Sequence, residues 1–142
     1  MPTAPASTAV SARSSAASST HMAMYVFAEP SDTFRKWLAN EALPARKPAT
    51  AQAREGERLF LSLPCSGCHT IRGTSADGTI GPDLTHLATR TTLAALTLPN
   101  DPPDLANWIE NPQRYKPGSK MPGFALTDRQ TAALVAYLDS LK

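Results

Sequence analysis

Cys65-Ser66-Gly67-Cys68-His69 is the stretch that decides the fold of this chain. Two cysteines three positions apart, followed directly by a histidine, form the attachment pattern of a c-type haem. Each thiol adds across one vinyl group of the porphyrin, and the adjacent His69 lies under the ring, where its imidazole can bind the iron. The chain has no other cysteine. The motif therefore predicts one covalent haem c, anchored by Cys65 and Cys68 and ligated by His69.

Two other chemistries use a Cys-x-x-Cys spacing, namely zinc half-sites and redox dithiols. Zinc would need two further ligands, and the remaining histidines, His21 and His86, lack the paired spacing of a zinc finger. A thioredoxin-like dithiol follows a β-strand, whereas the residues before Cys65 have a helical pattern. A zinc-binding structural module remains an alternative, which the colour of the protein would test.

Size and charge exclude several classes of function. The 142 residues carry 14 Lys and Arg against 12 Asp and Glu, a balance too mild to indicate nucleic-acid binding. No run approaches the roughly 20 apolar residues that span a bilayer. From residue 51 onward the chain has nine basic and nine acidic residues, so net charge alone does not predict strong electrostatic steering of a partner. We expect a monomer with one small domain and appendages.

The chain divides into three predicted parts. Residues 1–21, mostly Ala, Ser, Thr and Pro, predict a disordered tail, natural or added by engineering, because they cannot offset their ordering entropy. They also lack the basic start and apolar stretch of a signal peptide. Residues 22–49 predict a strand over 24–28, a helix after Pro30 and a proline-containing linker. Residues 50–142 form the expected compact domain.

Two amphipathic helices bracket this domain. One extends over residues 50–62 with Thr50 as N-cap, and the last begins at the capping box of Thr127 and Gln130. Because Gly56 lets another helix approach closely, Phe60 beside it is expected to meet Tyr137 in the last helix. Ordinary core positions in two amphipathic helices are the alternative.

Shorter elements are predicted between these helices. Asp83 is placed to cap a short helix over 84–89, and residues 93–96 are expected to add a helical turn. Residues 101–110 predict a helix with proline at its start, and the Pro- and Gly-rich stretch 116–124 predicts an irregular loop. The expected fold class is all-α.

The second axial position of the iron has Met121 as its first candidate. This residue lies in Lys120-Met121-Pro122-Gly123, a loop rigid enough to hold a thioether in place. Methionine normally fills gaps in a core, so its position in a loop is unusual and favours a role as ligand. His/Met ligation raises the reduction potential and favours pure electron transfer. His86 is the competitor for bis-histidine ligation, but it follows the motif closely and is predicted on a surface helix. A sixth position open to a small molecule, as in a haem enzyme or sensor, is a further alternative.

Other residues are expected to touch the cofactor. The imidazole that binds iron usually donates its second N–H to a carbonyl, and the Pro82 carbonyl in the stiff Gly-Pro turn is the candidate acceptor. Arg90, Trp108 and Tyr115 carry donors that could contact the haem propionates. For Trp108, a plain core position is an equal alternative.

By these residues the chain resembles a class I cytochrome c over roughly residues 50–142. The residues in family order are Gly56, Phe60, the Cys65–His69 motif, Gly81-Pro82, Met121 and Tyr137. It is most similar to the C-terminal cytochrome c domain of subunit II in caa3-type haem-copper cytochrome c oxidases. Residues 81–86, 97–100, 108–113 and 116–118 carry that closer similarity. Residues 22–38 resemble the end of the copper domain of that subunit.

The resemblance implies a small all-α cytochrome c fold, with the first and last helices crossing over a covalent haem. It implies one-electron transfer from a redox protein donor to the copper centre of the oxidase or to another cytochrome. The expected location is the periplasm or the outer face of the bacterial cytoplasmic membrane. The binuclear copper site of that family needs two bridging cysteines, which this chain lacks. A free-standing periplasmic carrier is the alternative.

Overall fold

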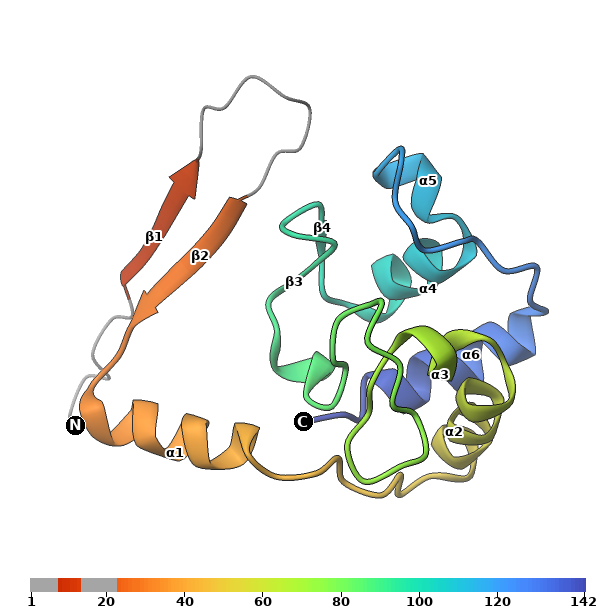
Figure 1. Ribbon diagram of the computed structural model, residues 1–142, viewed down its shortest axis with the longest axis horizontal. Coiled ribbons are helices and arrows are strands. Elements are labelled where there is room, and N and C mark those ends of the chain that lie inside the picture. Colours follow the sequence, from red (N-terminus) through yellow and green to blue (C-terminus); the bar gives the residue numbers. More distant parts are fainter. Residues whose placement is uncertain (1–7, 14–22) are drawn as a thin grey trace. The chain divides into compact units, whose positions relative to one another are not determined.

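The computed structural model describes residues 8–13 and 23–142 (Figure 1). The chain divides into two compact units, Met1–Ala42 and Leu43–Lys142. In the part of the chain that the structure describes, no helix has the length and apolar character needed to cross a membrane.

The N-terminal unit contains a strand pair and one helix. Strands β1 (Thr8–Arg13) and β2 (Ala23–Ala28) pair antiparallel, and helix α1 spans Ser31–Glu41. The strand predicted over 24–28 and the helix predicted after Pro30 are therefore confirmed. Strand β1 falls within the segment predicted to be disordered, and the rest of that segment lies outside the described residues.

The C-terminal unit is mostly helical, as predicted. Its elements are α2 (Ala51–Ser62), α3 (Cys65–Cys68), a 3₁₀ helix (Leu87–Thr89), β3 (Thr92–Leu93), β4 (Leu98–Pro99), α4 (Pro102–Glu110), α5 (Pro112–Tyr115) and α6 (Asp128–Leu138). Among these, α2 packs against α6, and α4 also contacts α6 (Figure 1). The loop between α5 and α6 contains no helix or strand, as predicted for residues 116–124.

Both bracketing helices begin at the predicted caps. The Thr50 hydroxyl accepts a hydrogen bond from the Ala53 amide at 3.0 Å. At α6 the Thr127 hydroxyl accepts from the Gln130 amide, while the Gln130 side chain accepts from the Thr127 amide. Each cap satisfies a backbone N–H that has no partner inside the helix.

The crossing of α2 and α6 depends on Gly56. A Cβ atom there would lie 2.6 Å from the Ala133 carbonyl carbon and 2.7 Å from Cβ of Tyr137. Only glycine permits this approach, which brings the Phe60 and Tyr137 rings into an edge-to-face contact at 6.0 Å. Both rings are almost fully buried, so the predicted meeting of Phe60 and Tyr137 is confirmed.

Two predicted helical segments are wrong. Between residues 84 and 89 only Leu87–Thr89 is helical, because the Asp83 carboxylate accepts from both the amide and the hydroxyl of Thr85 and closes a tight turn instead. Residues 93–96 lie in the β3–β4 hairpin. There Ala94, Ala95 and Leu96 have positive φ angles of 51°, 57° and 67°. A hydrogen bond from the Thr97 amide to the Leu93 carbonyl closes this left-handed turn.

Candidate functional site

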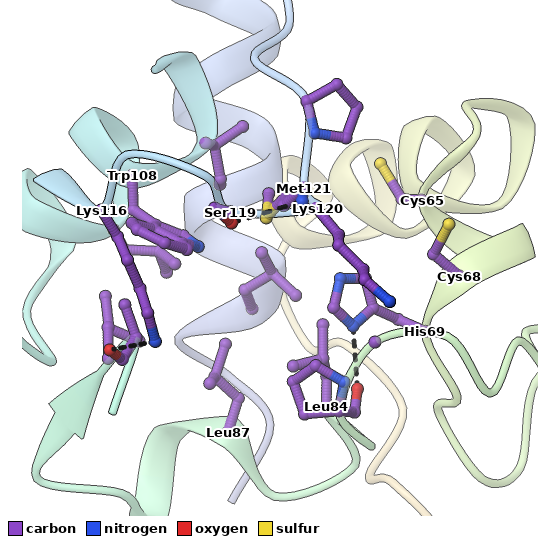
Figure 2. Close-up of a pocket in the computed structure, with 18 of the residues that line it drawn as sticks. Cys65, Cys68, His69, Leu84, Leu87, Trp108, Lys116, Ser119, Lys120 and Met121 are labelled. Carbon is purple, nitrogen blue, oxygen red and sulfur yellow. Dashed lines mark hydrogen bonds between the residues drawn. The ribbon is translucent and has the colours of Figure 1, made fainter. Parts of the chain in front are cut away.

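A cavity of about 760 Å³ lies inside the C-terminal unit (Figure 2). This volume is within the range of roughly 300–1,000 Å³ of sites that enclose a small molecule. Its walls are largely aliphatic and come from several elements. They include Leu84, Leu87, Leu93, Leu105, Ile109 and Leu134. Such a wall suits a large apolar ligand.

The two cysteine thiols lie on the wall of this cavity. Helix α3 is a single turn that follows Pro64, and the His69 amide closes it by donating to the Cys65 carbonyl at 2.9 Å. Both thiols are free. Burial raises the pKa of Cys65, and Cys68 adds to this effect against an opposing backbone hydrogen bond. Cys65 is therefore a neutral thiol at neutral pH, unlike the acidic thiolate of a redox dithiol.

His69 lines the cavity with its ring held in one orientation. Its Nδ1 lies 2.8 Å from the Pro82 carbonyl oxygen, which is the hydrogen bond predicted from the sequence. Because a carbonyl can only accept, Nδ1 carries a proton, and in the neutral imidazole Nε2 then keeps a lone pair. A Cβ on Gly81 would lie 2.6 Å from Nδ1 and 3.0 Å from Nε2. Gly81 therefore makes room for the imidazole, and Nε2 is the ring nitrogen that could bind a metal.

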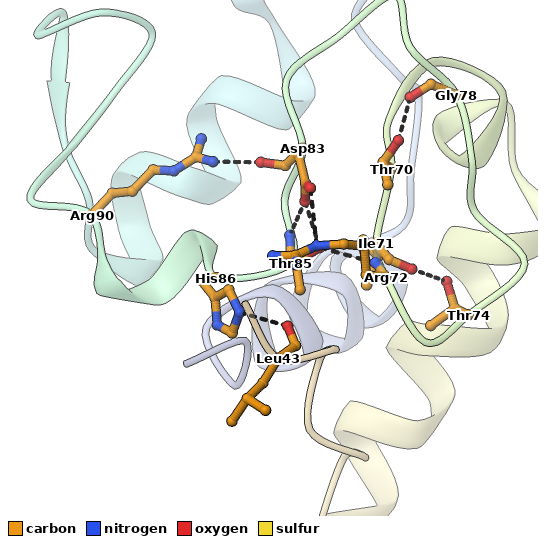
Figure 3. Close-up of polar contacts among 10 residues, drawn as sticks. All are labelled: Leu43, Thr70, Ile71, Arg72, Thr74, Gly78, Asp83, Thr85, His86 and Arg90. Carbon is orange, nitrogen blue, oxygen red and sulfur yellow. Dashed lines mark hydrogen bonds and ion pairs between the residues drawn. The ribbon is translucent and has the colours of Figure 1, made fainter. Parts of the chain in front are cut away.

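A polar network stands behind the Pro82 carbonyl (Figure 3). The Arg90 guanidinium donates to the Asp83 carbonyl, and Nε of Arg72 lies 3.3 Å from the Asp83 carboxylate. Thr85 donates to the same carboxylate and accepts from the Arg72 amide at 2.9 Å. Burial acts to raise the pKa of Asp83, but Thr85 and the two arginines outweigh it and lower that pKa. The ionised carboxylate fixes the turn that carries Pro82.

Met121 lines the same cavity from the loop that precedes α6. Its side chain is half-buried and packs against the hydrophobic core. Its amide donates to the Ser119 hydroxyl at 3.3 Å. The structure thus brings an imidazole from one part of the chain and a thioether from another to one apolar cavity.

The remaining predicted residues divide into two groups. Arg90 and Trp108 line the cavity, together with Lys116 and Lys120. Tyr115 is not among the lining residues; its ring lies 5.8 Å from the Arg114 guanidinium carbon. The propionate contacts of Arg90, Trp108 and Tyr115 stay predictions.

The sequence-based placement of His86 on a surface helix is wrong. His86 is only 4% exposed, and its Nε2 lies 3.0 Å from the Leu43 carbonyl oxygen (Figure 3). It is not part of the cavity wall. This geometry favours Met121 over His86 as the partner of His69, because the His86 ring faces the segment before α2.

Two contributors to the site were not identified from the sequence. One is the steric role of Gly81 against His69, for which a Gly-Pro pair gives only a turn signal. The other is Gln113 on α5, whose side-chain amide hydrogen-bonds to the loop of Met121. Nothing in the local sequence distinguishes this glutamine from any exposed polar residue, since its partners are backbone atoms.

The donor set fits a covalent haem better than a metal ion alone. Two free thiols adjoin a histidine with an available Nε2, and a thioether lies on the wall of the same apolar cavity. Over residues 8–13 and 23–142, no three His, Cys, Asp or Glu side chains gather as a metal site would require. Zinc in a structural site needs four such ligands, so the described residues do not support the zinc alternative.

Comparison with known proteins gives a consistent result. Residues 53–142 match the family model described as cytochrome c. Cytochrome c oxidase subunit 2 of Alkalihalophilus pseudofirmus is 32% identical over 112 residues, which cover 78% of this chain and 32% of that protein. The subunit 2 of Bacillus species strain PS3 is 34% identical over 120 residues, covering 80% and 33%. The chain thus spans about a third of the length of these curated relatives.

Among solved structures, the c-type cytochrome SorU from Sinorhizobium meliloti is 23% identical with a TM-score of 0.46, covering 63% of this chain and 90% of that one. The family match extends from near the start of α2 to the last residue, and it includes both cysteines, His69 and Met121. The chain belongs to the cytochrome c family.

Proposed function

We propose that this chain carries single electrons on one covalent haem c, as the haem domain of a cytochrome c oxidase subunit 2. The observation that carries the proposal is the convergence of Cys65, Cys68, His69 and Met121 on one apolar cavity. When bound, the haem supplies an iron that cycles between the ferrous and ferric states.

The chain's own residues would hold and orient the cofactor. Cys65 and Cys68 anchor it through thioether bonds, which fixes the ring beside His69. His69 offers Nε2 to the iron while Nδ1 donates to the Pro82 carbonyl, and this bond sets the ring plane and raises the basicity of the ligand. With the cofactor bound, the aliphatic wall would keep water from much of the ring, so less solvent would have to reorganise when the charge of the site changes.

Met121 would close the other side of the iron. A thioether at this position raises the reduction potential and leaves no coordination site for oxygen or peroxide. The half-buried side chain and its loop contacts support a closed site. A haem enzyme or ligand sensor would need that position open, so it is the less favoured function.

The oxidase assignment rests on the similarity to subunit 2 proteins. By this assignment the domain accepts an electron from a redox protein and passes it to the copper centre of the oxidase, outside the cytoplasmic membrane. This chain has no cysteine besides Cys65 and Cys68, so it holds no cysteines to bridge a copper pair. A free-standing periplasmic carrier is the second candidate.

Two measurements test these proposals separately. The full chain is produced in a host that matures c-type haem, and its spectrum is titrated against applied potential. We expect haem that stays attached after denaturation and a one-electron Nernst curve. Release of the haem on denaturation, or a colourless protein, would refute the proposal of a haem c electron carrier.

The oxidase link is tested by purifying the tagged natural gene product in detergent. Co-purification of copper-containing oxidase subunits is expected. Purification of the chain alone would favour the free-standing carrier.

A further inference from the structure

The loop of Met121 is tied to α5 by one side chain, Gln113. Its Nε2 donates to the Ser119 carbonyl at 2.7 Å and to the Met121 carbonyl at 3.3 Å. Its Oε1 accepts from the Gly118 amide at 2.9 Å. Both polar atoms of one amide group therefore bind backbone atoms of the loop between Gly118 and Met121.

Gln113 is well placed to act as an anchor because its own helix is fixed. Pro112 beside it is fully buried. The Asn111 side chain accepts from the Arg114 amide at 3.2 Å and caps α5. Gly118 has a φ of +83°, a conformation that favours glycine, and in it the Gly118 amide reaches Oε1 of Gln113.

The far end of the loop is also held. A Cβ on Gly123 would collide with the Glu110 carbonyl oxygen at the end of α4, so the backbone of Gly123 packs directly on that helix. Met121 thus lies between two attachments to the α4–α5 corner. Of the two, the Gln113 attachment reaches the Met121 carbonyl itself.

We propose that Gln113 is a positioning residue that holds the Met121 thioether on the haem iron. This inference rests on the proposed function, because it presupposes that Met121 is the sixth ligand. Gln113 is not among the residues that line the cavity. It acts by lowering the population of states in which the loop has moved away from the cavity. In those states a small basic molecule from solution can take the position of the thioether.

The size of the effect follows from the three hydrogen bonds. The Gln113 side chain is exposed, so each bond is taken at the lower end of the usual net contribution. Loss of all three then raises the open population about tenfold, and loss of the two Nε2 bonds raises it about fivefold. The apparent affinity for a competing ligand rises by the same factor, since it scales with the fraction of competent molecules.

The test uses two substitutions in the haem-loaded full chain. Gln113→Ala removes every contact, whereas Gln113→Glu has nearly the same shape, keeps an acceptor and lacks the donor. The dissociation constant of imidazole is measured for the ferric protein by optical titration. We expect imidazole to bind about tenfold tighter to Gln113→Ala. For Gln113→Glu we expect an increase of at least about fivefold, because its second carboxylate oxygen faces the Ser119 and Met121 carbonyl oxygens in place of the donor. Amide exchange at Gly118 should accelerate in both variants.

Gln130→Ala is the matched control. It removes the glutamine of the α6 capping box and lowers overall stability, but it leaves the Met121 loop untouched. Its imidazole affinity should equal that of the wild type. The positioning role is overturned if the Gln113 variants bind imidazole with wild-type affinity. It is equally overturned if Gln130→Ala changes the dissociation constant of imidazole as much as the Gln113 substitutions do.

The wild-type spectrum separates this inference from the proposed function. A thioether bond to ferric iron gives a weak band at the red end of the visible spectrum, which imidazole abolishes. If wild-type protein retains covalent haem but lacks that band, the assignment of Met121 fails and the role of Gln113 falls with it. If the band is present and only the Gln113 variants behave as wild type, the positioning role alone fails.

Discussion

Substitution of Gly56 by alanine tests the helix crossing that closes the cytochrome c domain. Alanine would gain about 0.5–1 kcal/mol from its higher helix propensity. Against this, its Cβ would lie 2.6 Å from the Ala133 carbonyl carbon and 2.7 Å from Cβ of Tyr137. The first of these is backbone and cannot rotate away, so overpacking should cost about 3 kcal/mol, the upper part of the usual range. The net expectation is a loss of about 2 kcal/mol.

Urea unfolding of the haem-loaded protein measures this loss directly. For a unit of this size, 2 kcal/mol corresponds to a fall in Tm of roughly 8–16 °C. Gly67→Ala is the matched control, because a Cβ there would meet no described atom within 4 Å beyond its chain neighbours and its own helix backbone. This variant should be as stable as the wild type or more so. If Gly56→Ala is as stable as Gly67→Ala, the account of the crossing is refuted.

Three further changes follow from the same structure. Tyr137→Phe should stabilise the protein by up to about 1 kcal/mol in urea unfolding, because its hydroxyl is buried with no hydrogen-bond partner among the described residues; a loss of stability would reveal a partner for that hydroxyl. The pKa of Asp83 lies below its ordinary value of 3.8, so the stability it contributes is present above that value and is lost as pH falls through the folded pKa. Asp83→Asn should therefore lose less stability than the wild type between about pH 5 and pH 2, and equal losses would contradict this linkage. Cys65→Ala or Cys68→Ala should each leave one thioether, whereas the double substitution should release all haem on denaturation, as mass spectrometry of the unfolded chain would detect.

Features of the fold that depend on local chemistry were predictable from the sequence. The caps at Thr50 and Thr127 follow from residue type and spacing, and the close approach at Gly56 follows from the absence of a side chain. The bond from His69 to the Pro82 carbonyl was also foreseen, because a histidine ligand needs an acceptor and a Gly-Pro turn supplies a free carbonyl.

Features set by distant contacts were not predictable in this way. Residues 93–96 look helical by propensity, but the pairing of β3 with β4 forces a left-handed turn on three non-glycine residues. Asp83 is a residue type that often caps helices, yet its carboxylate accepts a hydrogen bond from Thr85 and pairs with Arg72, which stabilises a turn instead. His86 is buried because its imidazole meets a carbonyl 43 residues earlier in the chain. Sequence spacing carries no signal of that contact.

The ferric optical spectrum of the haem-loaded chain tests the central claim most directly, namely that His69 and Met121 hold the iron from opposite sides. With this ligand set, the wild type should show the weak red band of a thioether–iron bond. In Met121→Ala the band should vanish while the haem stays covalently attached. The control variant His86→Ala should keep the band. A wild-type spectrum without the band, or a band that survives in Met121→Ala, would contradict ligation of the iron by His69 and Met121.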